Sequence, residues 1–150
     1  MKYNFRSDLT EKQREKFAER LLQLANILDK VPRKAYDHSS YKNDCGTTAC
    51  ALGWAVDSGE FKGLNLKFKK ESTDDYLLVV TRIPKYSGLS FSEDDEADRY
   101  FGEGIYHQVF TGYAFLQSTY RGIDIKTTPK TVAKRLRKIA LQQYGYIPND

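Results

Sequence analysis

The sequence predicts a single α+β domain over residues 1–150, with amphipathic helices at both ends, a buried central helix and a small antiparallel sheet. Three observations predict this fold. Apolar residues recur every three or four positions near both ends of the chain. Two runs between residues 64 and 83 are rich in strand-forming residues, and a short uncharged stretch near residue 50 is apolar enough for the centre of a core. A chain of 150 residues can bury a core of this kind without disulfides or a structural metal.

Residues 10–28 predict the first amphipathic helix. Thr10 and Gln13 have the spacing of a capping box, and Pro32 ends the pattern. The apolar positions that share one face are Phe17, Leu21, Leu24, Leu28 and Val31. The opposite face carries alternating acids and bases, which is typical of a solvated helix surface.

Residues 44–56 differ in composition from the segments on either side, because they are small, apolar and almost uncharged. With Thr47 as the N-cap, residues 48–56 predict a short helix that is buried on most sides. Gly53 permits close approach of another element. The side chains expected to pack in the core are Cys50, Leu52, Trp54 and Val56.

The middle of the chain predicts a hairpin and an acidic helix. Residues 64–68 alternate apolar and polar side chains, and residues 76–83 form a β-rich run, so the charged link between them predicts a hairpin. Ser92 is a good N-cap, and the acidic run 93–98 suits the positive first turn of a helix. The aromatic stretch 105–116 has a period that fits helix and strand equally, so both remain open.

The last predicted element is a helix that begins after Thr128. Thr128 is the N-cap, Pro129 occupies the first helical position and Gly145 follows the end. The residues of its apolar face are Val132, Leu136, Ile139 and Ala140.

Composition excludes several classes of protein. No stretch approaches the roughly 20 consecutive apolar residues of a membrane-spanning helix, and the N-terminus lacks the apolar core of a secretory signal. Two cysteines are too few for a disulfide framework. We therefore expect a cytoplasmic protein that does not contact a membrane.

The block Cys45-Gly46-Thr47-Thr48-Ala49-Cys50-Ala51-Leu52-Gly53-Trp54-Ala55 resembles a motif, Cys-Gly-Thr-x-x-Cys-x-x-Gly-Trp/His-Ala, of small uncharacterised bacteriophage and bacterial proteins. Looser similarity extends to the first helix, to residues 93–101 and to residues 128–139. The resemblance implies a phage or mobile-element setting, with the host cytoplasm as the location, and implies no activity. Residues 62–85 depart from the shorter members and are where an individual function is expected.

One chemical interpretation of the motif is a cysteine hydrolase. Cys45 precedes a predicted helix, whose N–H groups and dipole stabilise a thiolate. Asp44-Cys45-Gly46 before an apolar helix is similar to the nucleophile region of papain-like peptidases, with His107 as the base. Neither an oxyanion donor nor a third member can be named, and Asp124 is no more than a candidate for the third member. The hydrolase is therefore the alternative to the interpretation favoured below.

Two other interpretations of the motif are metal binding and a structural role. Cys45, Cys50, His38 and His107 form a ligand set that zinc accepts. Their spacing differs from that of common zinc modules, so the sequence predicts neither a metal nor a cofactor. We favour the structural role, in which the motif builds the core and function lies on the surface.

The expected functional surface is the base-rich C-terminal end. Between residues 121 and 138 there are seven basic side chains against the single acid Asp124. Aromatic rings that stack on bases, beside cations that hold phosphates, suit a nucleotide or single-strand site. The predicted ligand-binding residues are Arg121, Lys126, Lys130, Lys134, Arg137, Tyr113 and Tyr120.

The sequence thus favours a non-enzymatic, phage-type binding protein over an enzyme. The expected role is counter-defence, by sequestering a nucleotide-like anion or by blocking a host protein. Duplex DNA is not an expected partner, because the acidic run leaves a net charge of only +4. The sequence leaves self-association open.

Overall fold

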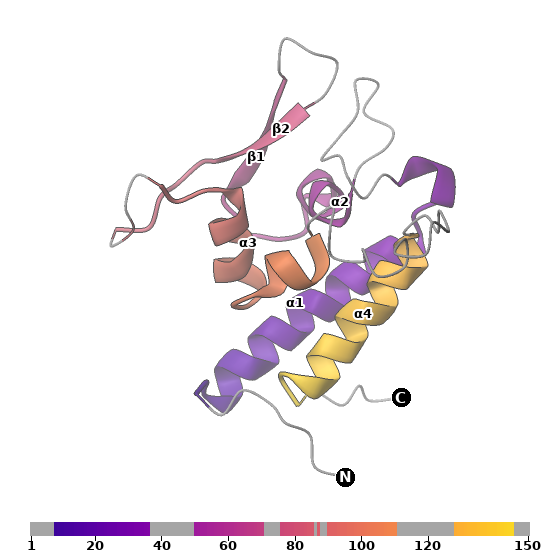
Figure 1. Ribbon diagram of the computed structural model, residues 1–150, viewed down its shortest axis with the longest axis vertical. Coiled ribbons are helices and arrows are strands. Elements are labelled where there is room, and N and C mark those ends of the chain that lie inside the picture. Colours follow the sequence, from indigo (N-terminus) through magenta and orange to yellow (C-terminus); the bar gives the residue numbers. More distant parts are fainter. Residues whose placement is uncertain are drawn as a thin grey trace, which may run out of the picture.

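The computed structural model describes residues 8–36, 50–70, 76–85, 87, 90–110 and 128–145. Within these ranges the fold is α+β, mostly helical with one two-stranded antiparallel sheet, as the sequence predicts (Figure 1). The elements are α1 (Glu11–Asp29), a 3-10 turn (Arg33–Ala35), α2 (Ala51–Ser58), β1 (Leu66–Lys70), β2 (Tyr76–Val80), α3 (Glu93–Phe101), a π-helical turn (Tyr106–Phe110) and α4 (Pro129–Gln142).

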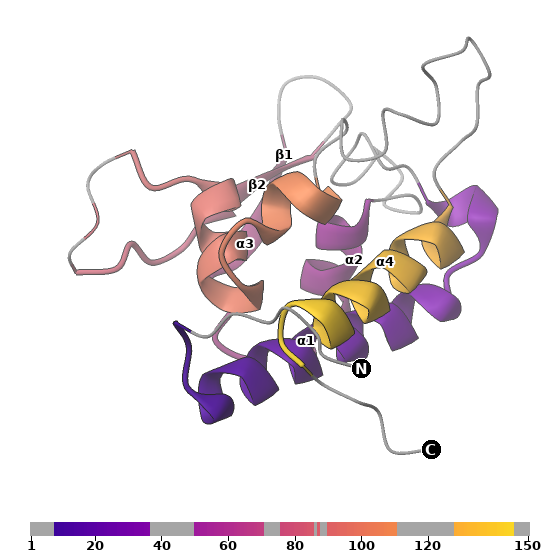
Figure 2. The same ribbon diagram turned by 60° about the horizontal axis from the view of Figure 1, so that its bottom comes forward.

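Helices α1 and α4 lie side by side and form the base of the molecule (Figures 1 and 2). Both begin where the caps predict: Thr10 forms a capping box with Gln13, and the Thr128 hydroxyl accepts the Thr131 N–H at 3.2 Å. Their facing side chains are fully buried and include Leu21, Leu24, Leu28, Val132 and Leu136. The amphipathic pattern at each end of the sequence is therefore confirmed.

Helix α2 begins later than the sequence predicts. Cys50 is its N-cap, with an extended backbone (φ −76°, ψ 178°), so this residue lies before the helix and not inside it. The first helical hydrogen bond runs from the Trp54 N–H to the Cys50 carbonyl, at 2.9 Å. Thr47, the predicted cap, lies outside the described residues.

The core role predicted for the motif is confirmed for part of it. Cys50 and Leu52 are buried, whereas Trp54 and Val56 are only partly buried. The Trp54 indole Nε1 donates to the Ala35 carbonyl at 3.2 Å. Trp54 therefore fixes the chain that follows α1 against α2, and its ring lies at the edge of the core.

The hairpin pairs Leu66 with Val80 and Phe68 with Leu78. Leu66 and Leu78 are buried on one face, while Lys67 and Lys69 are exposed on the other, as alternation requires. The first strand begins two residues later than predicted. Residues 64 and 65 precede it in a turn, in which the Leu64 N–H donates to the Phe61 carbonyl at 3.2 Å.

Helix α3 follows Ser92, whose N–H donates to the Asp95 carboxylate at 3.0 Å. Its last residue, Phe101, packs edge-to-face on Phe61 and Phe110, with ring centroids 5.4 and 5.5 Å apart. The aromatic stretch left open by the sequence is helical as far as residue 110, and the rest of that stretch lies outside the described residues. None of the helices in the described ranges combines the length and the apolar character needed to cross a membrane.

Gly102 allows the chain to turn directly after α3. Its φ is +127°, and a Cβ atom there would lie 2.9 Å from Cζ of Tyr144 and overlap the hydroxyl. We expect Gly102→Ala to lower the free energy of unfolding by about 2 kcal/mol or more, from overpacking and backbone strain together. Urea unfolding monitored by circular dichroism measures it.

Gly59→Ala is the matched control for this substitution. Gly59 also has a positive φ, of 68°, but a Cβ there meets nothing within 4 Å. Gly59→Ala should therefore lower the free energy of unfolding only through backbone strain, by about 1 kcal/mol. Equal losses in the two variants would show that Tyr144 does not pack against Gly102 in solution.

Candidate functional site

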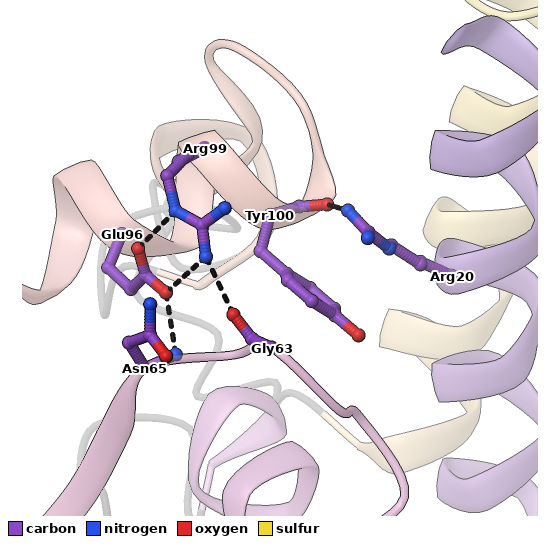
Figure 3. Close-up of polar contacts among 6 residues, drawn as sticks. All are labelled: Arg20, Gly63, Asn65, Glu96, Arg99 and Tyr100. Atoms are coloured by element: carbon purple, nitrogen blue, oxygen red, sulfur yellow. Dashed lines mark hydrogen bonds and ion pairs between the residues drawn. The ribbon is translucent and has the colours of Figure 1, made fainter. Parts of the chain in front are cut away.

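Glu96 is the buried charged side chain among the described residues, with an exposed fraction of 0%. It lies on the core-facing side of α3, beside the buried Ala97 and Tyr100. Its carboxylate accepts the Asn65 N–H at 2.6 Å, Arg99 Nε at 2.5 Å and Arg99 Nη2 at 2.8 Å (Figure 3). A buried carboxylate is stable only when it is paired and hydrogen-bonded, and these three donors meet that need.

Arg99 is held in place by the same contacts. Its Nη2 also donates to the Gly63 carbonyl at 2.7 Å, so one guanidinium joins α3 to the turn before β1 (Figure 3). The hydrogen bond with Glu96 raises the pKa of Arg99, so this side chain keeps its charge. Its side chain is 39% exposed, which leaves part of the guanidinium open to solvent.

Tyr100 connects this network to α1. The Arg20 Nη1 donates to the Tyr100 carbonyl at 2.6 Å, and the Arg20 guanidinium lies 3.8 Å from the centre of the Tyr100 ring. The Tyr100 hydroxyl donates to the Lys62 carbonyl at 2.9 Å. Burial raises the pKa of Tyr100 and lowers that of Arg20. The turn at residues 62–65 is thus fixed to α3, and α3 is fixed to α1.

A hollow of about 260 Å³ opens beside this network, and we call it the Arg99 pocket. Its lining residues are Asn65, Arg82, Pro84, Lys85 and Arg99. Arg82 and Lys85 are exposed, and neither forms a hydrogen bond or ion pair with another described residue. The lining therefore contains three cationic groups and no acid, a composition that favours an anion.

A larger hollow of about 440 Å³ lies between α1 and α2. Its lining combines Trp54 and aliphatic side chains with Lys30, Asp57 and Glu60, so charges of both signs meet there. This mixture does not select one class of charged ligand. We therefore take the Arg99 pocket as the candidate site, although it is the smaller hollow.

The structure describes three of the seven predicted ligand-binding residues. Lys130 and Lys134 are exposed on α4, and neither hollow includes them. Arg137 forms an ion pair with Asp29 and donates to Asn26 Oδ1 at 3.1 Å, which binds α4 to α1. The other four lie outside the described residues: Arg121, Lys126, Tyr113 and Tyr120.

The residues of the alternative hydrolase are not brought together in the described part of the chain. Cys45 and Asp124 lie outside it, and His107 is exposed on the π-helical turn. His38, which the sequence offers only as a metal ligand, also lies outside the described residues. Cys50 is buried, with 1% of its surface exposed. Over the described ranges, no group of three His, Cys, Asp or Glu side chains is arranged to hold a metal ion.

No family model matches this chain, and neither a curated protein nor a solved structure matches it. The resemblance to phage-type proteins therefore remains a prediction.

The sequence interpretation missed the Arg99 pocket. In the sequence, Glu96 is one of several acids at a helix start, although its spacing of four residues from Tyr100 places it on the same face as that aromatic residue. Nothing local marks Asn65 as its partner, because the two residues are 31 positions apart. In the sequence, this region is indicated only by the expectation that residues 62–85 depart from the proteins that the chain resembles.

Replacing Glu96 tests the network. Glu96→Gln keeps the size of the side chain but removes the charge that Arg99 binds, so we expect about 1–3 kcal/mol lower stability. The loss should be below that for a fully buried pair, because Arg99 is 39% exposed. Urea unfolding measures it, with the exposed Glu15→Gln on α1 as a control that stays within about 0.5 kcal/mol. Equal stability of both variants would contradict a structural role for the ion pair.

Asp98 supplies a prediction about pH. Burial raises its pKa, and this effect outweighs the hydrogen bonds from the Tyr106 and Gly104 backbones, which lower it. A raised carboxyl pKa means that the folded state binds the proton more tightly than the unfolded state. The stability that protonated Asp98 contributes is therefore fully present below the ordinary pKa of Asp. It is lost as the pH rises through the raised pKa of the folded state. The melting temperature of the wild type, compared with that of Asp98→Asn, should therefore fall as the pH rises from below the ordinary pKa of Asp to neutrality. A constant difference across that range would be evidence against the burial effect.

Proposed function

We propose that this protein is a non-enzymatic binding protein that sequesters a small, phosphate-bearing, nucleotide-like anion in the Arg99 pocket. The observation that carries the proposal is the lining, with three cationic side chains and no acid. Of these, Arg82 and Lys85 have no partner among the described residues, so their positive charge is available to a ligand.

The chemistry of the lining supports binding over catalysis. Arginine presents a planar fork of N–H donors that matches the oxygens of a phosphate, and lysine adds a compact charge. Arg99 is already oriented by Glu96 and Gly63, so it loses little conformational freedom when a ligand binds. In the described part of the chain, the lining supplies no cysteine–histidine pair of the kind that activates a nucleophile.

In this proposal the biological role is counter-defence, in which a phage-encoded protein withholds the ligand from a host system. The support for that role is the resemblance of residues 45–55 to bacteriophage proteins. The cysteine hydrolase stays the alternative that the sequence predicts, because Cys45 lies outside the described residues and the structure does not test it.

Calorimetric titration with inorganic pyrophosphate and with adenosine triphosphate, at an ionic strength of about 0.15 M so that remote charges are screened, tests the proposal. The double variant Arg82→Gln/Lys85→Gln should weaken binding of either probe at least about tenfold, because each charge-assisted hydrogen bond contributes about 1.5–3 kcal/mol. Its melting temperature should stay close to that of the wild type, because both side chains are exposed.

Two control variants make the same change in net charge elsewhere. Lys67→Gln/Lys69→Gln alters exposed residues of β1 outside the lining and should leave the affinity within about twofold. Lys130→Gln/Lys134→Gln tests the basic surface of α4. Loss of binding in the α4 variant, with binding kept in Arg82→Gln/Lys85→Gln, would move the site to α4. No binding of either probe to the wild type would overturn the proposal.

A further inference from the structure

The charge balance of the Arg99 pocket narrows the class of ligand. One of its three cations, Arg99, is bonded to the Glu96 carboxylate directly behind it. The other two, Arg82 and Lys85, have no partner among the described residues. The pocket and its supporting acid thus present two uncompensated positive charges.

The free donors of the pocket match a terminal group in number. Arg99 uses Nε and Nη2 for Glu96 and Gly63, while Nη1 takes part in no hydrogen bond to another described residue. The lining residues therefore supply three separate donor groups that no other described residue occupies: Nη1 of Arg99, the Arg82 guanidinium and the Lys85 ammonium. A phosphomonoester offers three acceptor oxygens, whereas a phosphodiester has only two that are not esterified.

We infer that the pocket selects a dianionic phosphomonoester over a monoanionic phosphodiester, an inference that rests on the proposed function. A phosphomonoester carries about −1.5 to −2 charge at neutral pH, and each diester of a nucleic acid carries one negative charge. The two negative charges of a monoester balance both uncompensated cations, whereas the single charge of a diester balances only one. The ligand is then a nucleotide-like molecule with a terminal phosphate, and neither a nucleic-acid strand nor a cyclic dinucleotide.

Adenosine monophosphate and cyclic adenosine monophosphate form the matched pair that tests this inference. The two probes share base and ribose and differ in whether the phosphate is a monoester or a diester. We expect calorimetry at neutral pH to show at least about tenfold tighter binding of the monoester, since one further charge faces two unpaired cations. In Arg82→Gln/Lys85→Gln the preference should fall to about twofold, and in Lys67→Gln/Lys69→Gln it should remain.

Methyl phosphate and dimethyl phosphate repeat the comparison without a nucleoside. Equal affinities within both pairs, each weakened by Arg82→Gln/Lys85→Gln, would overturn the inference and leave the proposed function standing. Tighter binding of either diester would also overturn it, as would binding of pyrophosphate alone. If pyrophosphate, adenosine triphosphate and all four esters fail to bind, the proposed function itself is wrong.

Discussion

The burial of one carboxylate, Glu96, constrains the upper part of this molecule more than any other single contact. A carboxylate with 0% of its surface exposed must be satisfied by nearby donors, and here these are the Asn65 N–H and the Arg99 guanidinium. Asn65 in turn accepts the Thr81 N–H at 2.9 Å through its own carbonyl, so the same residue closes the base of the hairpin. Glu96 therefore sets where the hairpin leaves the helical body and where the residues after β2 lie beside Arg99. The cationic lining of the pocket depends on this placement.

The helix pair beneath supplies the rigid reference for that network. Arg20 reaches from α1 to the carbonyl of Tyr100, and the Tyr100 ring packs against its guanidinium. On the other side of α1, Asp29 binds Arg137 of α4. Two arginines thus link α1 to the elements on either side of it. The sequence associates the basic residues of α4 with a ligand. One of them, Arg137, instead forms an ion pair within the fold.

Local signals were enough to predict α1, α3, α4 and the hairpin, but they could not reveal the pocket. Thr10, Ser92 and Thr128 mark helix starts through contacts with residues two or three positions away, and the alternation near Leu66 follows from the pleat of a strand. The pocket depends on contacts between residues 31 and 36 positions apart, Asn65 with Glu96 and Gly63 with Arg99. No spacing rule covers such pairs. The sequence misplaces the start of α2 for a related reason. Nothing in the composition of the motif indicates that the backbone of Cys50 is extended.

The two basic regions of the chain differ in what they can recognise. On α4, Lys130 and Lys134 stand exposed on a helix surface, where a bound anion would have to immobilise two long side chains and compete with water and salt. In the Arg99 pocket one cation is fixed before any ligand arrives, and a hollow of about 260 Å³ limits the size of what enters. In the proposed complex, Arg82 and Lys85 would add their charges to an anion that Arg99 orients. A fixed donor flanked by two adjustable ones discriminates by the charge and shape of a small group, whereas an open stripe discriminates mainly by total charge. For this reason the pocket, and not the more basic helix, is the better basis for specific recognition.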